Sequence, residues 1–214
     1  HIIWPLRFIM PHDKSLRPAW LIRIGLFLYD WLAFGKRKLL PGSKGIKLYK
    51  HLAGAALQDQ YIKGFEYSDA WVQDARLVVL NAMDAAEHGA EIQTRTACMD
   101  AQRGTSGWTV QLQSSVDGSV HKVQSRCLVN AAGPWVSSFL DDVSHIHSHH
   151  QLRQIKGSHI VVPKIFSHDY AYIFQNIDKR VVFAMPYEGD YTLIGTTELN
   201  YPNNDSKPQI TTDE

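Results

Sequence analysis

The chain contains 214 residues, of which 44% are hydrophobic, so it is long enough to bury the core of one large domain or of two small ones. Its 22 basic and 21 acidic residues give a formal net charge of +1, which argues against nucleic acid as the main partner. Two cysteines, Cys98 and Cys127, are far apart and do not make a disulfide framework, so a reduced, cytosolic setting is favoured. No run of uncharged apolar residues is long enough to span a membrane.

The first predicted element is a helix over residues 17–34. Its aromatic and aliphatic residues recur at helical spacing, with Trp20 and Trp31 among them, and the basic run Lys36-Arg37-Lys38 follows directly. An apolar helix with a basic end is typical of a segment that lies in a membrane interface. Aromatic stripes at helical spacing also occur in protein cores, so the residues alone leave both interpretations open.

A second helix is predicted over residues 69–88, because an acidic entry precedes apolar residues at helical spacing and Gly89 supplies a stop. Residues 90–94 read as a strand, which makes the pair half of a βαβ unit. A three-stranded meander follows, with glycine-containing turns between its strands. These strands are predicted at residues 97–102, 108–113 and 120–129.

The segment from Leu128 to Trp135 is the most informative part of the chain. It predicts a buried strand at residues 127–129, a tight turn of small residues, and a helix that starts at Pro134. Small residues let a ligand approach the backbone closely, and a helix N-terminus favours anionic or polar groups. A ligand-binding turn is therefore predicted here, although such turns also occur where two elements only pack closely.

A second β-rich region follows, and the fold class is predicted to be mixed α/β (α+β) with an antiparallel sheet in this part. Its strands are predicted at residues 159–162, 170–175, 180–186 and 191–196.

The loop between the two regions is rich in histidine. His145, His147 and His149 would share one face of an extended strand, and imidazole is a ligand for zinc, copper or nickel. The loop contains no cysteine, and the nearby acids Asp141 and Asp142 lie on the side of the preceding helix. We therefore predict no metal site in it.

The two ends of the chain have the character of a piece of a longer protein. The chain starts inside an apolar run, and Thr211 and Glu214 have the spacing of a capping box, which announces a helix beyond them. We therefore interpret the chain as a central fragment.

Five motifs together carry a resemblance to one enzyme family. In chain order they are Gly64-Phe65-Glu66-Tyr67-Ser68-Asp69, Asp74-Ala75-Arg76-Leu77, Asn130-Ala131-Ala132-Gly133-Pro134-Trp135-Val136, Lys156-Gly157-Ser158-His159-Ile160-Val161-Val162-Pro163 and Gly195-Thr196-Thr197-Glu198. With these motifs the chain resembles the middle of the FAD-dependent, quinone-linked (aerobic) glycerol-3-phosphate dehydrogenases. The resemblance covers almost the whole chain, although the family's Gly-x-Gly-x-x-Gly motif for the FAD pyrophosphate is missing from it.

The resemblance implies oxidation of sn-glycerol 3-phosphate to dihydroxyacetone phosphate, with a hydride passing to FAD and electrons leaving to a membrane quinone. It implies a cytoplasmic, peripheral location on the inner face of the cell membrane, where residues 17–34 and the basic run after them form an interfacial patch, and it leaves a homodimer open. We expect the fragment alone to be inactive and to hold FAD weakly.

The resemblance also assigns residues to the cofactor and the substrate. It places FAD against Ala97 on a strand and against the turn residues Ala131, Ala132 and Gly133. His159 would face substrate and flavin, as a base or as a hydrogen-bond partner of the C2 hydroxyl. The remaining substrate-binding candidates are Arg153, Lys156, Thr196 and Thr197. Arg153 and Lys156 suit a phosphate, or are solvated charges on a strand edge.

The domain boundary implied by the resemblance is nominal, because the two domains of this fold interleave. Residues 1–150 are expected to form a membrane-proximal helical segment and a portion of the FAD-binding domain, in a fold with two dinucleotide-binding parts. Residues 151–214 are expected to form part of an antiparallel-sheet substrate domain. Two alternatives stay open: a relative that oxidises amines or amino acids, and a non-catalytic membrane-binding module.

Overall fold

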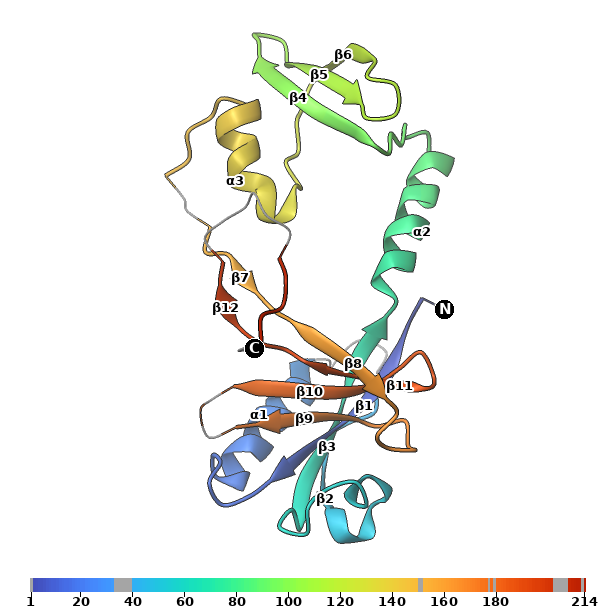
Figure 1. The fold of residues 1–214 in the computed structure, drawn as a ribbon, viewed down its shortest axis with the longest axis vertical. Helices are drawn as coiled ribbons and strands as arrows, with labels where there is room; N and C mark the ends of the chain where they lie inside the picture. The colour runs from blue at the N-terminus through green and yellow to red at the C-terminus, as the bar shows by residue number, and fades with distance from the viewer. Residues whose placement is uncertain are drawn as a thin grey trace. The chain divides into compact units, whose positions relative to one another are not determined.

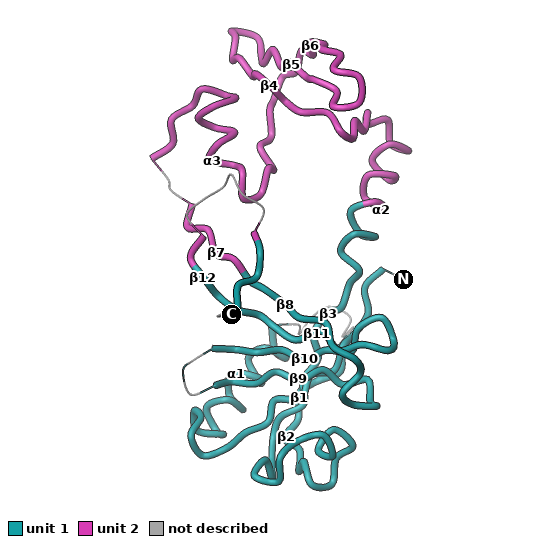
Figure 2. Tube along the Cα trace, viewed as in Figure 1, with its two compact units in different colours: residues 1–78, 157–199, 209–214 teal, residues 79–156, 200–208 magenta. Residues whose placement is uncertain are grey.

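A computed structural model describes residues 2–32, 40–149, 152–176, 178, 180–201, 208–212 and 214. The chain divides into two compact units, coloured separately in Figure 2. Unit 1 comprises residues 1–78, 157–199 and 209–214, and unit 2 comprises residues 79–156 and 200–208. The units therefore interleave along the sequence.

Unit 1 is built on a sheet of seven strands within the described residues, in the order β2-β3-β1-β9-β10-β11-β8 (Figure 1). The strands are β1 (Ile3–His12), β2 (Lys44–Lys47), β3 (Lys63–Val72), β8 (His159–Pro163), β9 (Ala171–Gln175), β10 (Val181–Tyr187) and β11 (Tyr191–Gly195). Neighbouring strands are antiparallel except β1 and β9, which pair in parallel where Phe8 faces Ala171. The sheet thus joins strands that precede unit 2 in the sequence with strands that follow residue 156.

One core cluster of unit 1 surrounds Tyr172 on β9. Ile9 of β1 and Ala184 of β10 belong to it, and two short 3-10 helices, η1 (Leu48–Lys50) and η2 (Leu52–Gly54), contribute Leu48 and Ala53. The Tyr172 hydroxyl donates to the Ala53 carbonyl oxygen at 2.5 Å, and burial raises the pKa of this tyrosine to about 12. The hydroxyl also lies 2.8 Å from Nε2 of the buried His168, so the polar end of Tyr172 is satisfied within the core.

Helix α1 (Ala19–Leu32) confirms the helix predicted over residues 17–34 within the described part of that range. Leu26 is its one buried residue, and it packs with Met10 of β1 and Phe65 of β3. Large apolar side chains of the helix are exposed: Trp20, Leu21, Ile24, Phe27, Leu28, Tyr29, Trp31 and Leu32. In this chain α1 therefore packs through a narrow stripe only, and most of its apolar surface is uncovered.

Unit 2 contains a three-stranded antiparallel meander of β4 (Thr96–Arg103), β5 (Trp108–Ser114) and β6 (Val120–Ser125). After it come a 3-10 turn η3 (Gly133–Trp135), a short helix α3 (Val136–Ser138) and a π-helical turn η4 (Phe139–Val143). Helix α2 (Asp74–Glu87) runs from unit 1 into unit 2. Strands β7 (Ile155–Lys156) and β12 (Leu199–Asn200) form a separate two-stranded ribbon.

Most predicted elements are confirmed, and so is the mixed α and β class with antiparallel sheets. The three meander strands, the four strands of the second β-rich region and the stop at Gly89, whose φ is +92°, are all present. No helix of the described residues has the length and apolar character needed to cross a membrane.

Three local predictions were wrong. Residues 69–72 belong to β3, so α2 starts only at Asp74. Residues 90–94 are not a strand: they are exposed, and pairing with β5 begins only where Thr96 faces Ser114. Because β3 and β4 lie in different sheets, α2 does not complete a βαβ unit.

The predicted buried strand at residues 127–129 is also wrong. Strand β6 ends at Ser125, where its pairing with β5 ends opposite Trp108. Cys127 is exposed and Val129 is 83% exposed. An apolar sequence predicted burial here, but no strand of the described chain pairs with these residues.

Candidate active site

The candidate site in unit 1 lies where β8 begins and β11 ends. His159 is the first residue of β8 and faces Gly195, the last residue of β11, across the antiparallel pair. Strand β8 lies at the edge of the sheet, and the His159 side chain is exposed. The position leaves the imidazole accessible to a small ligand.

The position of the His159 ring depends on residue 195 being glycine, which has no Cβ. A Cβ at residue 195 would overlap with His159 Cδ2, and it would stand 2.8 Å from His159 Cγ and 2.9 Å from the Ser158 carbonyl oxygen. Real Cβ atoms essentially never approach other atoms this closely, so the ring lies across space that only glycine leaves open. Sequence reasoning did not assign Gly195 a role, because its importance follows from strand register.

Two residues next to this pair hold the strands together. Ser158 N donates to Thr197 Oγ1 at 2.9 Å, and Thr197 N donates to the Ser158 carbonyl oxygen at 3.3 Å. Thr196 Oγ1 donates to the Thr197 carbonyl oxygen at 3.0 Å. A Cβ on Gly157 would overlap with Thr196 Oγ1, so glycine is needed there too. Both threonines of the predicted substrate set thus lie beside His159, with their hydroxyls engaged in the local structure.

The predicted cofactor turn lies in unit 2 and is fixed by Asn130. Its side chain accepts from Ala132 N at 3.2 Å and donates to the Val136 carbonyl oxygen at 2.9 Å. Gly133 has a φ of +56°, a conformation that favours glycine, and a Cβ added there would meet nothing within 4 Å. Open space over a rigid turn of small residues fits a bulky polar group such as a dinucleotide. Trp135, at the end of the same turn, is 60% exposed.

The other predicted residues of unit 2 lie on its strands and loops. Ala97 is exposed on β4 and faces Gln113 of β5. Arg153 Nε donates to Asn200 Oδ1 at 2.9 Å, and Lys156 is half-buried on β7. A guanidinium with one donor fixed by an amide retains further donors for an anion.

The histidine-rich loop pairs with separate carboxylates. His145 Nε2 lies 2.9 Å from Asp100 Oδ1, and His147 Nδ1 lies 3.4 Å from Asp141 Oδ1. Among the described residues, no three His, Cys, Asp or Glu side chains gather as metal ligands. His150 lies outside the described residues.

A buried carboxylate in unit 1 was missed by the sequence reasoning. Glu66 on β3 is 3% exposed and pairs with Arg7 of β1, while Lys44 Nζ lies 3.1 Å and His51 Nε2 3.5 Å from its Oε2. Burial by itself raises the pKa of Glu66, but the hydrogen bonds and charges of Arg7 and Lys44 outweigh it, and the pKa lies below its ordinary value. Glu66 is thus ionised and joins β1, β2 and β3.

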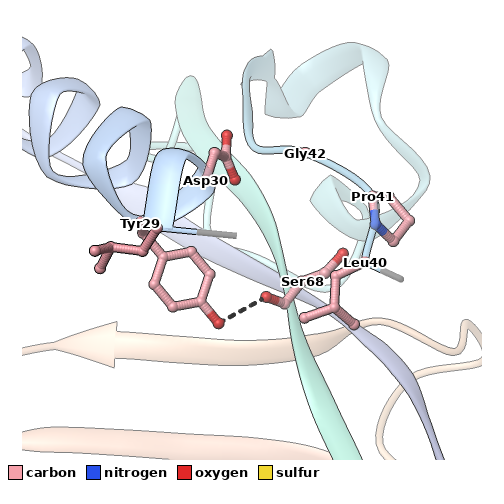
Figure 3. A pocket seen from close by; sticks show the side chains of 7 residues that line it. Tyr29, Asp30, Leu40, Pro41, Gly42 and Ser68 are labelled. Carbon is pink, nitrogen blue, oxygen red and sulfur yellow. Dashed lines mark hydrogen bonds between the residues drawn. The ribbon is translucent and has the colours of Figure 1, made fainter. Parts of the chain in front are cut away.

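A cavity of about 300 Å³ lies at the end of α1 (Figure 3). Its lining is mainly apolar and includes Leu32, Leu40 and Pro41. The Tyr29 hydroxyl donates to the Ser68 carbonyl oxygen, and Asp30 accepts from the backbone and the hydroxyl of Ser43. Because these polar groups are engaged, the cavity suits apolar contact and does not provide a site for a phosphate.

The sequence and the fold match a known class. The chain belongs to the FAD-dependent oxidoreductase family, whose model matches residues 1–214. It is 53% identical over 201 residues to a D-erythritol 1-phosphate dehydrogenase of Brucella abortus, covering 94% of this chain and 40% of that protein. It is 50% identical over 214 residues to a glycerol-3-phosphate dehydrogenase of Pseudomonas aeruginosa, covering all of this chain and 41% of that protein. The chain thus spans about two fifths of the length of these relatives.

A solved structure has the same fold. The glycerol-3-phosphate dehydrogenase of Bacillus halodurans, solved with FAD, superimposes with a TM-score of 0.75 over 99% of this chain and 38% of that chain, at 23% identity. The family and the fold predicted from the five motifs are confirmed.

Proposed function

We propose that the full-length protein containing this chain oxidises sn-glycerol 3-phosphate to dihydroxyacetone phosphate. The observation that carries the proposal is the exposed imidazole of His159, held over Gly195 in a strand pair fixed by Ser158 and Thr197. The name of the Pseudomonas aeruginosa relative supports this substrate.

His159 hydrogen-bonds the C2 hydroxyl and accepts its proton, which an imidazole does well near neutral pH. The chemistry that FAD supplies when bound is acceptance of the hydride from C2. Arg153 and Lys156 hold the phosphate, and Thr196 and Thr197 shape the wall beside the imidazole.

Unit 2 contributes to the FAD-binding part of the protein in this proposal. Ala131, Ala132 and Gly133 provide the turn that a diphosphate and ribose approach, and Ala97 offers backbone groups to the adenine. The sheet of unit 1 belongs to the substrate-binding part. The open space at Gly133 and the rigidity given by Asn130 support this assignment.

D-erythritol 1-phosphate is the second candidate substrate, favoured by the name of the Brucella abortus relative. It carries the same groups as glycerol 3-phosphate with one more hydroxylated carbon, so one site chemistry serves both. The relative kcat/KM for the two polyol phosphates would decide between them.

The test is dye reduction by the purified full-length flavoprotein with each polyol phosphate. We expect turnover with glycerol 3-phosphate and a loss of kcat of about 10²- to 10⁴-fold in His159→Ala. Full activity in the variant would remove His159 from the reaction. Turnover of erythritol phosphate alone would assign the second substrate, and turnover of an amine or amino acid instead would reject the proposal.

The electrons leave to a membrane quinone in this proposal, and the protein lies on the cytoplasmic face of the membrane. The exposed apolar side chains of α1, with Trp20 and Trp31 among them, support an interfacial role for this helix. The basic run Lys36-Arg37-Lys38 lies outside the described residues and adds attraction to anionic lipids. A homodimer is compatible with this arrangement.

A further inference from the structure

The carboxylate of Glu214 bridges the two strand ends that carry the candidate site. Its Oε1 accepts from Ser158 Oγ at 2.8 Å and from Thr197 Oγ1 at 3.0 Å. Ser158 immediately precedes His159, and Thr197 lies two residues after Gly195. One oxygen atom thus receives a hydrogen bond from each side of the His159–Gly195 pair.

The direction of these hydrogen bonds is fixed by the chemistry of the hydroxyl group. Thr197 Oγ1 accepts from Ser158 N, and a hydroxyl has a single hydrogen, which it donates to Glu214. An ionised carboxylate accepts from both hydroxyls without competition, because it has no donor of its own. The bridge is therefore a charge-assisted contact that orders Ser158 and Thr197 together.

The second carboxylate oxygen of Glu214, Oε2, contacts a different residue, Thr211. Oε2 accepts from Thr211 N at 2.9 Å, as expected from the Thr-x-x-Glu spacing of a capping box, and it also accepts from Thr211 Oγ1 at 3.1 Å. Capping uses Oε2 alone and leaves the contacts of Oε1 unexplained. The two roles can be separated, because glutamine also serves in a capping box.

We propose that Glu214 is a positioning residue for His159, acting through Ser158 and Thr197. This inference rests on the proposed function, in which His159 takes the proton of the substrate hydroxyl. By fixing Ser158, Glu214 fixes the backbone from which the imidazole extends over Gly195. A shift of about 1 Å in a reacting group can cost about 10²-fold in rate.

The test is a double-mutant cycle in the full-length flavoprotein with Glu214→Gln and His159→Ala. Glutamine keeps one oxygen for Thr211 and places an amide against two hydroxyls. We expect Glu214→Gln to lower kcat by about 10- to 100-fold with KM changed less than about threefold. In the His159→Ala background it should have almost no further effect, because both changes remove the same interaction. The matched control Glu198→Gln, exposed on the neighbouring segment, should leave kcat unchanged.

Three results would overturn the inference. These are an unchanged kcat in Glu214→Gln, an equal loss in both backgrounds, and a loss shared by the control. If His159→Ala keeps full activity, the role of His159 fails as well, whereas an impaired His159→Ala beside an intact Glu214→Gln removes Glu214 alone. Should Glu214→Gln not fold, Ser158→Ala, which leaves the capping box complete, decides the question by the same cycle.

Discussion

At the scale of single residues, the position of the His159 imidazole depends on Gly195, which has only a hydrogen where other residues have a side chain. Side chains directly opposite each other in an antiparallel pair normally compete for the same space. At the pair of His159 and Gly195 only one of the two has a side chain, so the ring extends across the partner strand. The position of the proposed proton acceptor is therefore set by the opposite strand.

Gly195→Ala is expected to displace the ring and lower kcat of the full-length enzyme by about 10²-fold. The added Cβ would meet the ring and the Ser158 carbonyl oxygen, and backbone atoms of a paired strand give way only at a cost. Steady-state kinetics with the flavin content of each sample measures this. Gly45→Ala in β2 is the control, since its Cβ would meet nothing within 4 Å. Equal kcat values in the two variants would contradict the argument.

Sequence motifs identified His159, Thr196 and Thr197, and the structure places all three at one pair of strand ends. The motifs include Gly195 and Ser158 but gave neither a role, because which residue faces His159 depends on the register of two strands far apart along the chain. The ion pair between Glu66 and Arg7 could not be predicted for the same reason.

At the scale of elements, the long pairing of β1 with β3 contains a charged group inside it. Ten residue pairs connect the two strands, from Ile3 with Val72 to His12 with Lys63. Glu66 lies within this stretch and binds Arg7 across the pair. Protonation of Glu66 removes the negative charge of the pair and leaves the charge of Arg7 without compensation. The contact therefore makes the stability of the paired strands depend on pH.

Glu66→Gln is expected to lower the free energy of unfolding by about 3 kcal/mol at neutral pH. Because the folded-state pKa of Glu66 lies below the ordinary value of 4.5, its contribution is complete above that value and is lost as the pH falls through the folded-state pKa. Urea unfolding of the full-length protein across this range should show the two curves converging in acid. Glu87→Gln on α2 is the exposed control. A difference independent of pH would count against the ionised pair.

Replacement of Lys36, Arg37 and Lys38 by glutamate is expected to weaken co-sedimentation with anionic vesicles by more than about 10²-fold, at about 1 kcal/mol for each basic residue near the surface. Binding to neutral vesicles, carried by the exposed apolar side chains of α1, should change little. Unchanged binding to anionic lipid would argue against the interfacial patch.

Element prediction succeeded where the local pattern and the pairing agree. The meander β4–β5–β6 has turn residues at its bends and a partner for each strand. It failed at residues 127–129, where apolar side chains find no partner strand among the described residues. Hydrophobic patterns report burial, and burial depends on parts of the fold that the local sequence does not contain.

At the scale of the whole molecule, the candidate cofactor residues and the candidate substrate histidine belong to different units. The candidate cofactor turn lies in unit 2, and His159, the proposed proton acceptor, lies in unit 1. Neither unit contains a Gly-x-Gly-x-x-Gly motif. The chain therefore carries surfaces that suit FAD without the loop that holds its pyrophosphate in the family.

Residues 1–214 produced alone are expected to purify without stoichiometric flavin, because the missing loop supplies the backbone donors for the pyrophosphate. The visible absorption spectrum of the purified sample measures the flavin directly, and the full-length protein prepared in parallel is the control. A yellow sample with one flavin per chain would refute this prediction.

The parallel contact of β1 with β9 has a consequence for how the chain folds during synthesis. Phe8 of β1 can pair with Ala171 of β9 only after residues 79–156 of unit 2 have been synthesised. Until then β1 has β3 on one side and an unpaired edge on the other, which is the kind of surface that pairs with the wrong strand. Contacts between residues so distant in sequence also form slowly. The edge of β1 is therefore open to mispairing until the β9 segment has been synthesised.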